Sequence, residues 1–394
     1  MKILVLNSGS SSIKFQLFNA DTNESLVSGV IEQIGEKISH AKIKFENKEL
    51  KKEASIPNHK IGLEIMNSLL IESKIIKDLC EIDGIGHRVV HGGEEFSEPT
   101  VINKSVVEQI EKLIPLAPLH NPANLEGIKS SMEHCPNVPQ VAVFDTAFHS
   151  NIPPHAYMYA LPYETYEKDG VRRYGFHGTS HHYIAKEAAK YLQIDVNKLN
   201  AITLHLGNGA SMSAVKSGKS IDTTMGLTPL EGLVMGTRCG DIDPAIIFYL
   251  SRTEGLSIDE LDSMLNKKSG LKGICGNNDM REVGEMAQKG DEKAKLALDM
   301  FNYRIKKYIG SYSAVLGRVD CLIFTGGIGE NDTEVRKNSC SNLENLGISL
   351  DLKANSQRAD KIIEISKKES KVKVLVIPTN EELEIALQVK SLIS

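Results

Sequence analysis

The sequence lacks the patterns that mark several common classes of protein. Its six cysteines are scattered and form no CxxC pair, so we expect neither a zinc site nor a disulfide framework, and a reducing cytoplasm fits. No apolar run approaches the roughly 18 residues of a membrane span, so no membrane partner is expected. The first residues read as a strand rather than as the basic and apolar regions of a signal peptide. These absences predict a cytoplasmic protein.

A basic excess is also missing. The 394 residues have a formal net charge of -5 at pH 7, whereas a general nucleic-acid binder would show an excess or a stripe of basic residues. We therefore expect no nucleic-acid partner, and anionic substrates would need local clusters of Arg and Lys. A chain of this length is too long for one compact core and predicts two domains.

The first eighteen residues predict a β-hairpin with an unusual turn. Apolar residues form a strand over residues 2–6, and they alternate again from Ile13 to Leu17. The turn between them contains four serines, Asn7 and Gly9, and its hydroxyl and N–H groups would suit an oxyanion such as phosphate. Lys14 would add a positive charge beside it. A polar surface hairpin explains this stretch equally well.

A second hairpin of the same kind is predicted over residues 201–215. Gly207, Asn208 and Gly209 form its tip, and Asn-Gly is a strong hairpin signal. Two similar hairpins about 200 residues apart, each at the head of one half, indicate a duplication. Two near misses exclude other nucleotide motifs, because Ser213 replaces the first glycine of a P-loop and residues 325–331 lack the GxGxxG register.

Several charged residues have two interpretations each. Arg88 lies in a short apolar strand among glycines, where a buried charge needs either a core carboxylate or a ligand as its partner. Arg238 lies in a glycine-punctuated loop and is either an anion clamp or a solvated side chain. Asp145 ends a buried strand over residues 141–144, where it either serves a site or caps a turn.

Further features surround these residues. Helices are expected over residues 59–80, 124–133 and 291–316, with more strands between 26 and 56. A strand over residues 320–324 leads into a glycine loop that precedes a helix near Asp332. Thr179 or Ser180 is expected to cap the helix after His177. Thr379 and Glu382 are expected to form a capping box, which leaves Glu381 free to face a site.

Nine blocks in order along the chain resemble the signature blocks of the acetate kinases. The family belongs to the superfamily of sugar kinases, heat-shock chaperones and actin. The blocks are NSGSSSIKF, GHRVVHGG, LAPLHNP, FDTAFH, YGFHGTSH, HLGNGAS, GLTPLEGLVMGTRCGDIDP, FTGGIGEN and TNEE. They extend from residue 7 to residue 382, so the resemblance covers essentially the whole chain.

The resemblance implies an α/β fold of two duplicated domains of the sugar kinase and actin (ribonuclease H-like) type. Each domain would be a mixed five-stranded sheet with flanking helices, and a nucleotide would bind in the cleft between them. The first domain would comprise residues 1–149 and be completed by a C-terminal helix, residues 382–394. The second, residues 150–381, would bind adenosine and form a homodimer.

The implied reaction is the reversible, magnesium-dependent transfer of a phosphoryl group from ATP to acetate, which gives acetyl phosphate and ADP and serves acetyl-CoA biosynthesis. Mn²⁺ can replace Mg²⁺ in this family. A carboxylate is already ionised at pH 7, so direct in-line attack needs charge neutralisation and alignment rather than a strong base.

The resemblance also implies roles for single residues. Arg88 and Arg238 would hold acetate and the transferring phosphoryl group, and His177 would donate to its equatorial oxygens. Asp145 and Glu381 would bind magnesium and its water shell. Two further residues would lie close by, Asn7 near the metal and His120 near acetate.

The binding surfaces implied for the substrates draw on four sets of residues. The first phosphate loop would consist of Ser10, Ser12 and Lys14. The second would consist of His205, Leu206, Gly207, Asn208 and Gly209. Adenosine would be contacted by Asp279, Met280, Arg281, Gly326, Gly327, Ile328, Gly329, Glu330 and Asn331, with Met280 standing where an aromatic residue is common. The apolar pocket for the acetate methyl would consist of Val90, Leu119, Phe176 and Pro229.

Two other functions fit the same fold. A kinase that prefers propionate or butyrate would differ in one apolar pocket, where a methylene group is worth only about 1–3 kcal/mol. A non-catalytic nucleotide-binding sensor would keep the phosphate loops but would have no reason to keep Arg88, His177 and Arg238 beside a small pocket.

Overall fold

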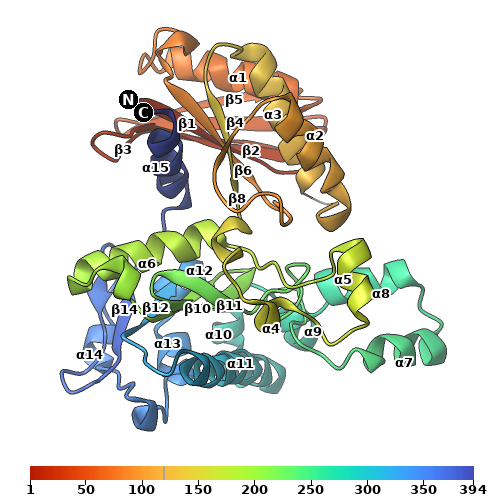
Figure 1. The fold of residues 1–394 in the computed structure, drawn as a ribbon, viewed down its shortest axis with the longest axis vertical. Helices are drawn as coiled ribbons and strands as arrows, with labels where there is room; N and C mark the ends of the chain where they lie inside the picture. Colours follow the sequence, from red (N-terminus) through yellow and green to blue (C-terminus); the bar gives the residue numbers. More distant parts are fainter. Residues whose placement is uncertain (119) are drawn as a thin grey trace. The chain divides into compact units, whose positions relative to one another are not determined.

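The computed structural model describes residues 1–118 and 120–394, so Leu119 lies outside the described residues. The chain forms two compact units. Unit 1 comprises Met1–Phe148 and Asn380–Ser394, and unit 2 comprises His149–Thr379. Both chain ends belong to unit 1, with the last helix dark blue beside the red first strands in Figure 1.

Unit 1 is built on an eight-stranded sheet in the order β5-β4-β3-β2-β1-β6-β8-β7. Its strands are β1 (Lys2–Ser8), β2 (Ser12–Asn19), β3 (Glu24–Glu32), β4 (Ser39–Phe45), β5 (Lys48–Ala54), β6 (Gly84–Val89), β7 (Thr100–Val101) and β8 (Gln140–Phe144). Its helices are α1 (His59–Glu72), α2 (Lys104–Lys112), α3 (Asn121–His134) and α15 (Glu381–Ile393).

The two faces of this sheet are covered by different helices because successive strand residues point to opposite sides. Leu4 and Leu6 of β1 pack in the core cluster that also contains Leu63 and Met66 of α1. On the other face α15 packs against β6. Gly84 makes room for it, because a Cβ atom there would lie 2.5 Å from a side-chain carbon of α15.

The predicted opening hairpin is confirmed. β1 and β2 pair antiparallel, and the Gly9 N–H donates to the Ser12 carbonyl at 2.8 Å across the turn. Ile13, Phe15 and Leu17 are buried on one face, as their alternation predicted. The serine-rich turn is therefore held at the end of two core strands.

Unit 2 is built on a six-stranded sheet in the order β11-β10-β9-β12-β14-β13. Its strands are β9 (Ala201–Leu206), β10 (Ala210–Lys216), β11 (Lys219–Thr223), β12 (Cys321–Thr325), β13 (Ile363–Glu364) and β14 (Lys373–Val376). Its helices are α4 (Pro154–Tyr157), α5 (Tyr163–Asp169), α6 (Gly178–Leu192), α7 (Ala245–Glu254), α8 (Ile258–Lys267), α9 (Gly270–Cys275), α10 (Met280–Gln288), α11 (Glu292–Leu316), α12 (Gly326–Asn331), α13 (Thr333–Ser339) and α14 (Leu352–Asn355). Helices α6 and α11 lie on opposite faces of this sheet (Figure 1).

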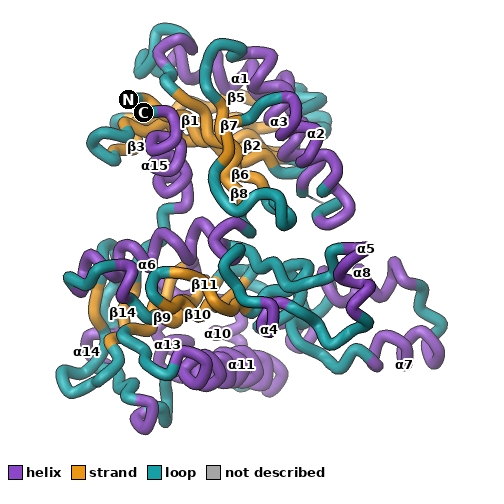
Figure 2. Tube along the Cα trace, in the orientation of Figure 1, coloured by secondary structure: helices purple, strands orange, loops and turns teal. Residues whose placement is uncertain are grey.

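The two sheets contain the same arrangement of five strands. The strands of both units are drawn in orange in Figure 2. In unit 1 the core order is β3-β2-β1-β6-β8, and in unit 2 it is β11-β10-β9-β12-β14. In each core the first three strands are antiparallel and the next two pairings are parallel. This repeat confirms the expected duplicated α/β fold, although β4, β5, β7 and β13 enlarge the sheets beyond five strands.

The helices differ from the prediction in two places. The helix expected over residues 59–80 ends at Glu72, where Ser73 caps it. The glycine segment expected as a loop is the short helix α12, closed by Glu330, whose Oε1 accepts the Gly326 and Thr379 backbone N–H groups at 3.0 Å each. Tertiary hydrogen bonds thus outweigh the low helix propensity of glycine.

The expected capping box of the last helix is wrong. Helix α15 begins at Glu381, and its N-cap is Asn380, whose side chain caps the first turn. The Thr379 hydroxyl instead lies 2.9 Å from the Ser180 hydroxyl. Glu381 is nevertheless the first residue of the helix, next to the cap. Within the described ranges, no helix combines the length and the apolar character that crossing a bilayer requires.

Candidate active site

In unit 1, the predicted residues Arg88 and Asp145 form an ion pair at the ends of two neighbouring parallel strands. Arg88 belongs to β6, and Asp145 directly follows β8. The Arg88 guanidinium donates to both carboxylate oxygens of Asp145, from Nε at 3.1 Å and from Nη2 at 2.5 Å, and Nη1 donates to Asn7 Oδ1 at 3.4 Å. The partner that a buried arginine requires is thus a carboxylate that is itself a candidate site residue.

Glu381 contributes a second carboxylate to this group. Burial raises its pKa, and the positive charge of Arg88 partly opposes that shift. Burial lowers the pKa of Arg88, but the charges of Asp145 and Glu381 outweigh burial and leave it raised. One cation therefore sits among two carboxylates and the amide of Asn7 in unit 1.

Two asparagines of α3, which were not among the predicted site residues, hold the backbone around Arg88. Asn124 accepts from the Val90 N–H at 3.1 Å and donates to the Ser8 carbonyl at 2.7 Å, which ties the end of β6 to the end of β1. Asn121 exchanges hydrogen bonds with the backbone of His91. Both are fully buried, and the burial of an amide in a helix is visible only in the folded chain.

The remaining predicted residues of unit 1 lie at the turn and at the start of α3. Ser10 is exposed at the tip of the β1–β2 hairpin, and Lys14 is exposed on β2 directly opposite Asn7. Ser12 begins β2. His120 directly precedes α3, which has a proline in its first turn as expected.

In unit 2, His177 has a backbone conformation that is uncommon for a residue with a side chain. Its φ of 56° lies in the left-handed region, and it forms the N-cap of α6 without a side-chain cap. Thr179 and Ser180, the expected caps, lie inside the helix. The imidazole of His177 stacks on that of His205 from β9, with ring centroids 4.3 Å apart.

Arg238 and His177 meet beside the second hairpin turn. A Cβ atom built on Gly209 would lie 3.5 Å from Arg238 Nη1 and 3.6 Å from His177 Nε2. Gly209 therefore leaves open a space that both side chains border. Burial lowers the pKa of Arg238, and among the described residues its guanidinium bonds only to the Pro229 carbonyl, at 3.3 Å.

A partly buried ion pair that the sequence did not predict holds the loop before Arg238. Arg173 Nη2 donates to Glu231 Oε1 at 2.6 Å, and Tyr159 donates to Glu231 Oε2 at 2.5 Å. Arg173 also donates to three successive carbonyls that begin at Thr223. These contacts fix both ends of the segment that carries Pro229.

A pocket of about 850 Å³ lies next to the same turn, entirely within unit 2. Eight of the predicted nucleotide-binding residues line it, namely Gly207, Asn208, Asp279, Met280, Arg281, Gly327, Ile328 and Asn331. Four lining residues were not predicted, namely Asn278, Asp332, Thr333 and Arg358. The pocket is large enough for a nucleoside, and its lining includes Gly207 and Asn208 of the second hairpin turn.

Other predicted nucleotide residues support this pocket rather than line it. Glu330 uses its carboxylate to close α12, as described above. Gly326 has a φ of 77°, and a Cβ atom there would lie 2.7 Å from the Leu206 carbonyl, so only glycine lets α12 approach the end of β9 this closely. Gly329 is buried inside α12.

Comparison with known proteins agrees with this geometry. The sequence pattern of the acetokinase family matches residues 2–387, nearly the whole chain. The chain belongs to the acetokinase family. The acetate kinase of Helicobacter acinonychis is 56% identical over 394 residues, which cover 99% of this chain and 98% of that protein. The acetate kinase of Sulfurovum sp. is 56% identical over 395 residues, which cover 100% and 99%.

Solved structures of the acetokinase family have the same fold. Acetate kinase from Porphyromonas gingivalis superposes with a TM-score of 0.96 at 46% identity and covers 100% of both chains. A propionate kinase from Francisella tularensis superposes with a TM-score of 0.93 at 49% identity and covers 99% of both chains. The predicted family and fold class are therefore confirmed.

The oxygen atoms of unit 1 fit the magnesium ion that the family implies. Mg²⁺ is usually bound by one or two carboxylates together with water and substrate phosphates. Asp145 and Glu381 supply two carboxylates, and Asn7 supplies an amide oxygen beside them. Within the described part of the chain, no group of three or more His, Cys, Asp or Glu side chains forms a metal site, so a protein-only cage is not what this donor set resembles.

The residues expected around the acetate methyl group belong half to each unit. Val90 follows β6 in unit 1 and is buried, and Leu119 lies outside the described residues. Phe176 is buried directly before His177 in unit 2, and Pro229 accepts the hydrogen bond of Arg238. Each described member therefore neighbours one of the charged residues assigned to the site.

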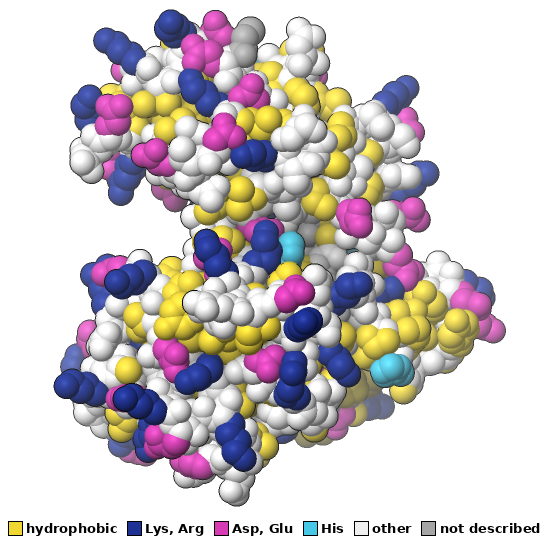
Figure 3. Space-filling model, turned by 60° about the vertical axis from the view of Figure 1, so that its left-hand side comes forward, with side chains coloured by type: hydrophobic (Ala, Val, Ile, Leu, Met, Phe, Trp, Pro, Cys, Tyr) yellow, Lys and Arg dark blue, Asp and Glu magenta, His cyan; other side chains and the backbone are white. Residues whose placement is uncertain are grey.

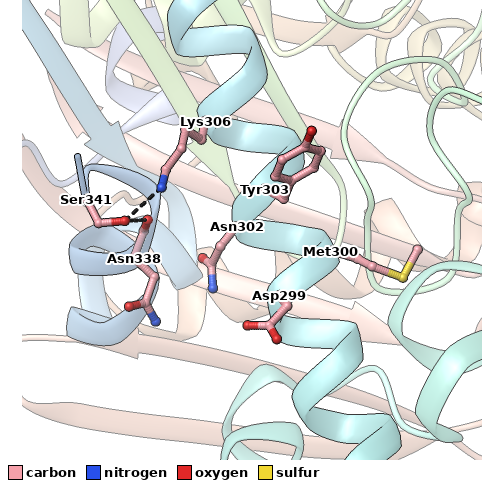
Figure 4. Close-up of a pocket in the computed structure, with 7 residues that line it drawn as sticks. All are labelled: Asp299, Met300, Asn302, Tyr303, Lys306, Asn338 and Ser341. Atoms are coloured by element: carbon pink, nitrogen blue, oxygen red, sulfur yellow. Dashed lines mark hydrogen bonds between the residues drawn. The ribbon is translucent and has the colours of Figure 1, made fainter. Parts of the chain in front are cut away.

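A second pocket lies away from all the predicted site residues. It has a volume of about 460 Å³ and lies between α11 and the C-terminal end of α13 with the residues that follow it (Figure 4). Its one cation, Lys306, donates to the Ser341 hydroxyl at 2.7 Å. Because it contains none of the glycine turns, it is not a candidate for nucleotide binding.

Proposed function

We propose that the chain is an acetate kinase that reversibly transfers the γ-phosphoryl group of ATP to the carboxylate of acetate. The observation that carries this proposal is the open space at Gly209, which is bordered by Arg238 Nη1 and His177 Nε2 and adjoins the 850 Å³ pocket. Membership of the acetokinase family and the names of its relatives support the choice of acetate as the acceptor.

The reaction needs electrostatic alignment rather than proton transfer. An oxygen of acetate forms a bond to the γ-phosphorus while the bond to the β–γ bridging oxygen breaks, and that oxygen leaves with its electron pair as ADP. Acetyl phosphate and ADP result, and no proton is exchanged. Arg238 and His177 would stabilise the charge on the phosphoryl oxygens, and Arg88 would hold the acetate carboxylate.

The two units would contribute to one ATP molecule. Adenosine would occupy the unit 2 pocket, where the buried Met280 offers an apolar contact in place of an aromatic ring. Ser10, Ser12 and Lys14 of unit 1 would bind phosphate oxygens, as would the turn at Gly207–Gly209. Asn7, Asp145 and Glu381 would hold Mg²⁺, which when bound neutralises charge on the phosphates, and Mn²⁺ would bind the same oxygen atoms.

Propionate is the specific alternative acceptor, because a propionate kinase is among the structural relatives. One methylene group changes binding by only about 1–3 kcal/mol, so both acids would be used to some extent. The numerous acetate kinases at about 55% identity favour acetate as the better substrate.

A homodimer and a cytoplasmic location remain parts of the proposal. Apolar side chains are visible on the surface of unit 2 among charged ones (Figure 3). The exposed apolar residues of unit 2 include Phe248 and Tyr249 of α7, each 62% exposed, and Ile258 of α8, which is 86% exposed. Such a surface fits contact with a second copy. The cytoplasmic location rests on the scattered cysteines.

The decisive test is the initial rate with acetate, propionate and butyrate, each with ATP and Mg²⁺, with the acyl phosphate trapped by hydroxylamine. We expect product with acetate at the highest kcat/KM, less with propionate and least with butyrate. Equal or higher kcat/KM with propionate would reassign the acceptor. ATP binding without product from any of the three acids at neutral pH would leave the nucleotide-binding sensor as the better description.

A further inference from the structure

A chain of hydrogen bonds leads from His177 into the core of unit 2. His177 Nδ1 lies 2.8 Å from the Ser211 hydroxyl oxygen, which lies 2.8 Å from His181 Nε2. His181 Nδ1 in turn lies 2.8 Å from the Thr203 hydroxyl oxygen, and that hydroxyl donates to the Ser213 carbonyl at 3.4 Å. Ser211, His181 and Thr203 are all 0% exposed, so water cannot replace any of these partners.

The direction of every bond follows from the carbonyl at the end of the chain. A carbonyl only accepts, so the Thr203 hydroxyl uses its one proton there, and Thr203 must accept from His181 Nδ1–H. Burial holds the pKa of His181 well below its usual value, so the ring is neutral and its Nε2 has a lone pair. Ser211 then donates to His181, and its oxygen accepts from His177 Nδ1–H.

We propose that Ser211 and His181 are positioning residues that hold His177 as the Nδ1–H tautomer, so that its Nε2 can donate to a phosphoryl oxygen only when the ring is a cation. This inference rests on the proposed function, in which His177 Nε2 faces the transferring group. A neutral His177 in this tautomer would present a lone pair to the phosphate oxygens and repel them. The active form of the site therefore carries two positive charges, one on Arg238 and one on His177.

The surroundings of His177 make that second charge depend on the ligand. Arg238 Nη1 borders the same space from the loop, and the His205 ring is stacked on His177 from β9. From α6, the neutral His181 reaches it through Ser211. A cation at Arg238 disfavours a proton on His177 Nε2, whereas a bound triphosphate favours it. Binding of ATP would thus favour the protonated form of His177, which in turn stabilises the transferring phosphoryl group.

The tautomer can be observed without any activity measurement. We would label the full-length protein with ¹⁵N-histidine and record two-bond ¹⁵N–¹H correlations above the titration of His177, with His177→Gln to assign its signals. The wild type should show the Nδ1–H pattern. Ser211→Ala should show the Nε2–H pattern, because the acceptor for Nδ1–H is gone and this is the form that free imidazole prefers.

Ser213→Ala is the matched control. Ser213 lies two residues farther along β10, is equally buried, and bonds through its hydroxyl to Ser220 and the Asp222 carbonyl instead of a histidine. It should keep the wild-type pattern at His177. An Nε2–H pattern in the wild type would overturn the proposal whether or not the protein makes acetyl phosphate, and Ser211→Ala with an unchanged pattern would do the same.

The second readout is kcat as a function of pH, from about pH 6 to pH 9, at saturating ATP and acetate. The wild type should lose kcat as pH rises and His177 loses the proton on Nε2. Ser211→Ala should have a lower kcat at low pH, but its kcat should depend less on pH. The ratio of kcat at pH 6 to kcat at pH 9 should therefore be smaller than in the wild type by about fivefold or more. Ser213→Ala should follow the wild type, because titration of ATP itself affects all three proteins alike.

A merely structural role of Ser211 would lower kcat by the same factor at every pH, and that result would contradict the proposal. Absence of product from the wild type at every pH would instead refute the proposed function, while the tautomer measurement would still decide the inference about Ser211.

Discussion

Units 1 and 2 each contain one partly buried arginine that we assign to the site, and the two have opposite surroundings. Arg88 donates to both oxygens of Asp145 and lies near Asn7 and a second carboxylate. Arg238, among the described residues, bonds only to the carbonyl of Pro229. The charge of Arg88 is balanced by the protein, whereas Arg238 has no carboxylate partner among the described residues, which fits the anion-binding role that we propose for it.

This difference separates folding from function. Removing one member of a buried pair leaves the other charge without compensation, which costs stability. Removing a charge that has no partner in the protein takes an interaction from the bound ligand, but it changes the free energy of unfolding little. We therefore expect Arg238 to serve mainly catalysis, and we expect Arg88 to serve both catalysis and the stability of the fold.

The largest expected effect is on the rate of Arg238→Ala. Because preorganised arginines on transferring phosphoryl groups are worth about 10³–10⁵ in rate, we expect kcat to fall by about 10³ or more in steady-state assays with acetate and ATP. Ser11→Ala, a truncation in the other hairpin turn, is the control and should change kcat by less than about threefold. Comparable losses in both variants would mean that the loop of Arg238 has been misinterpreted.

The next effect is on stability. Arg88→Ala leaves Asp145, whose side chain is 3% exposed, without its cation, and we expect a loss of about 3–5 kcal/mol in the free energy of unfolding. Arg238→Ala should change it by less than about 1 kcal/mol, measured for both by urea titration. Equal losses in the two variants would remove the contrast on which the comparison rests.

The smallest effect concerns pH, where the two units should behave alike. Unit 1 buries His87 and unit 2 buries His149, and burial lowers the pKa of each of these two histidines to about 4. The unfolded chain takes up a proton near pH 6.5, whereas the folded chain does so only near pH 4. Stability is therefore lost as pH falls through this window, by about 2 kcal/mol per histidine at pH 5.

The check is urea unfolding at pH 7.5 and pH 5 for the wild type, His87→Gln and His149→Gln. Each variant should lose less stability than the wild type on acidification. His40→Gln, on the surface of β4, is the control and should lose as much as the wild type, since its side chain is 49% exposed. If only one of the two variants, His87→Gln or His149→Gln, reduced the loss of stability on acidification, the two units would not respond alike.

The sequence predicts those features that depend on neighbours along the chain. Both hairpins, the long helix α11 and the strand before Asp145 follow from local alternation and turn residues, and the structure contains them. Eight of the residues that the family resemblance assigned to nucleotide binding line one pocket. Local pattern and family resemblance together thus predict the fold, and they bring the residues proposed for nucleotide binding to one pocket.

Contacts between residues far apart in the chain could not be predicted from the sequence. Whether Arg88 faced a core carboxylate or a ligand stayed open, and the structure shows a carboxylate 57 residues away. The path from His177 to His181 through Ser211 joins a helix to a strand, and no spacing rule connects them. The helix at 326–331 also eluded prediction, because its closure depends on a backbone N–H that lies 49 residues farther on.

The position of α15 has a consequence for how the chain is made. Its 13 residues pack on β6, where the glycines at 84 and 86 leave space for them. A ribosome delivers β6 early and α15 last, so the apolar face of unit 1 stays uncovered while all of unit 2 is synthesised. Unit 2 is one continuous segment and can fold as soon as it emerges. The first unit to be translated is therefore completed only after unit 2, and during that interval its sheet exposes the apolar surface that α15 later covers.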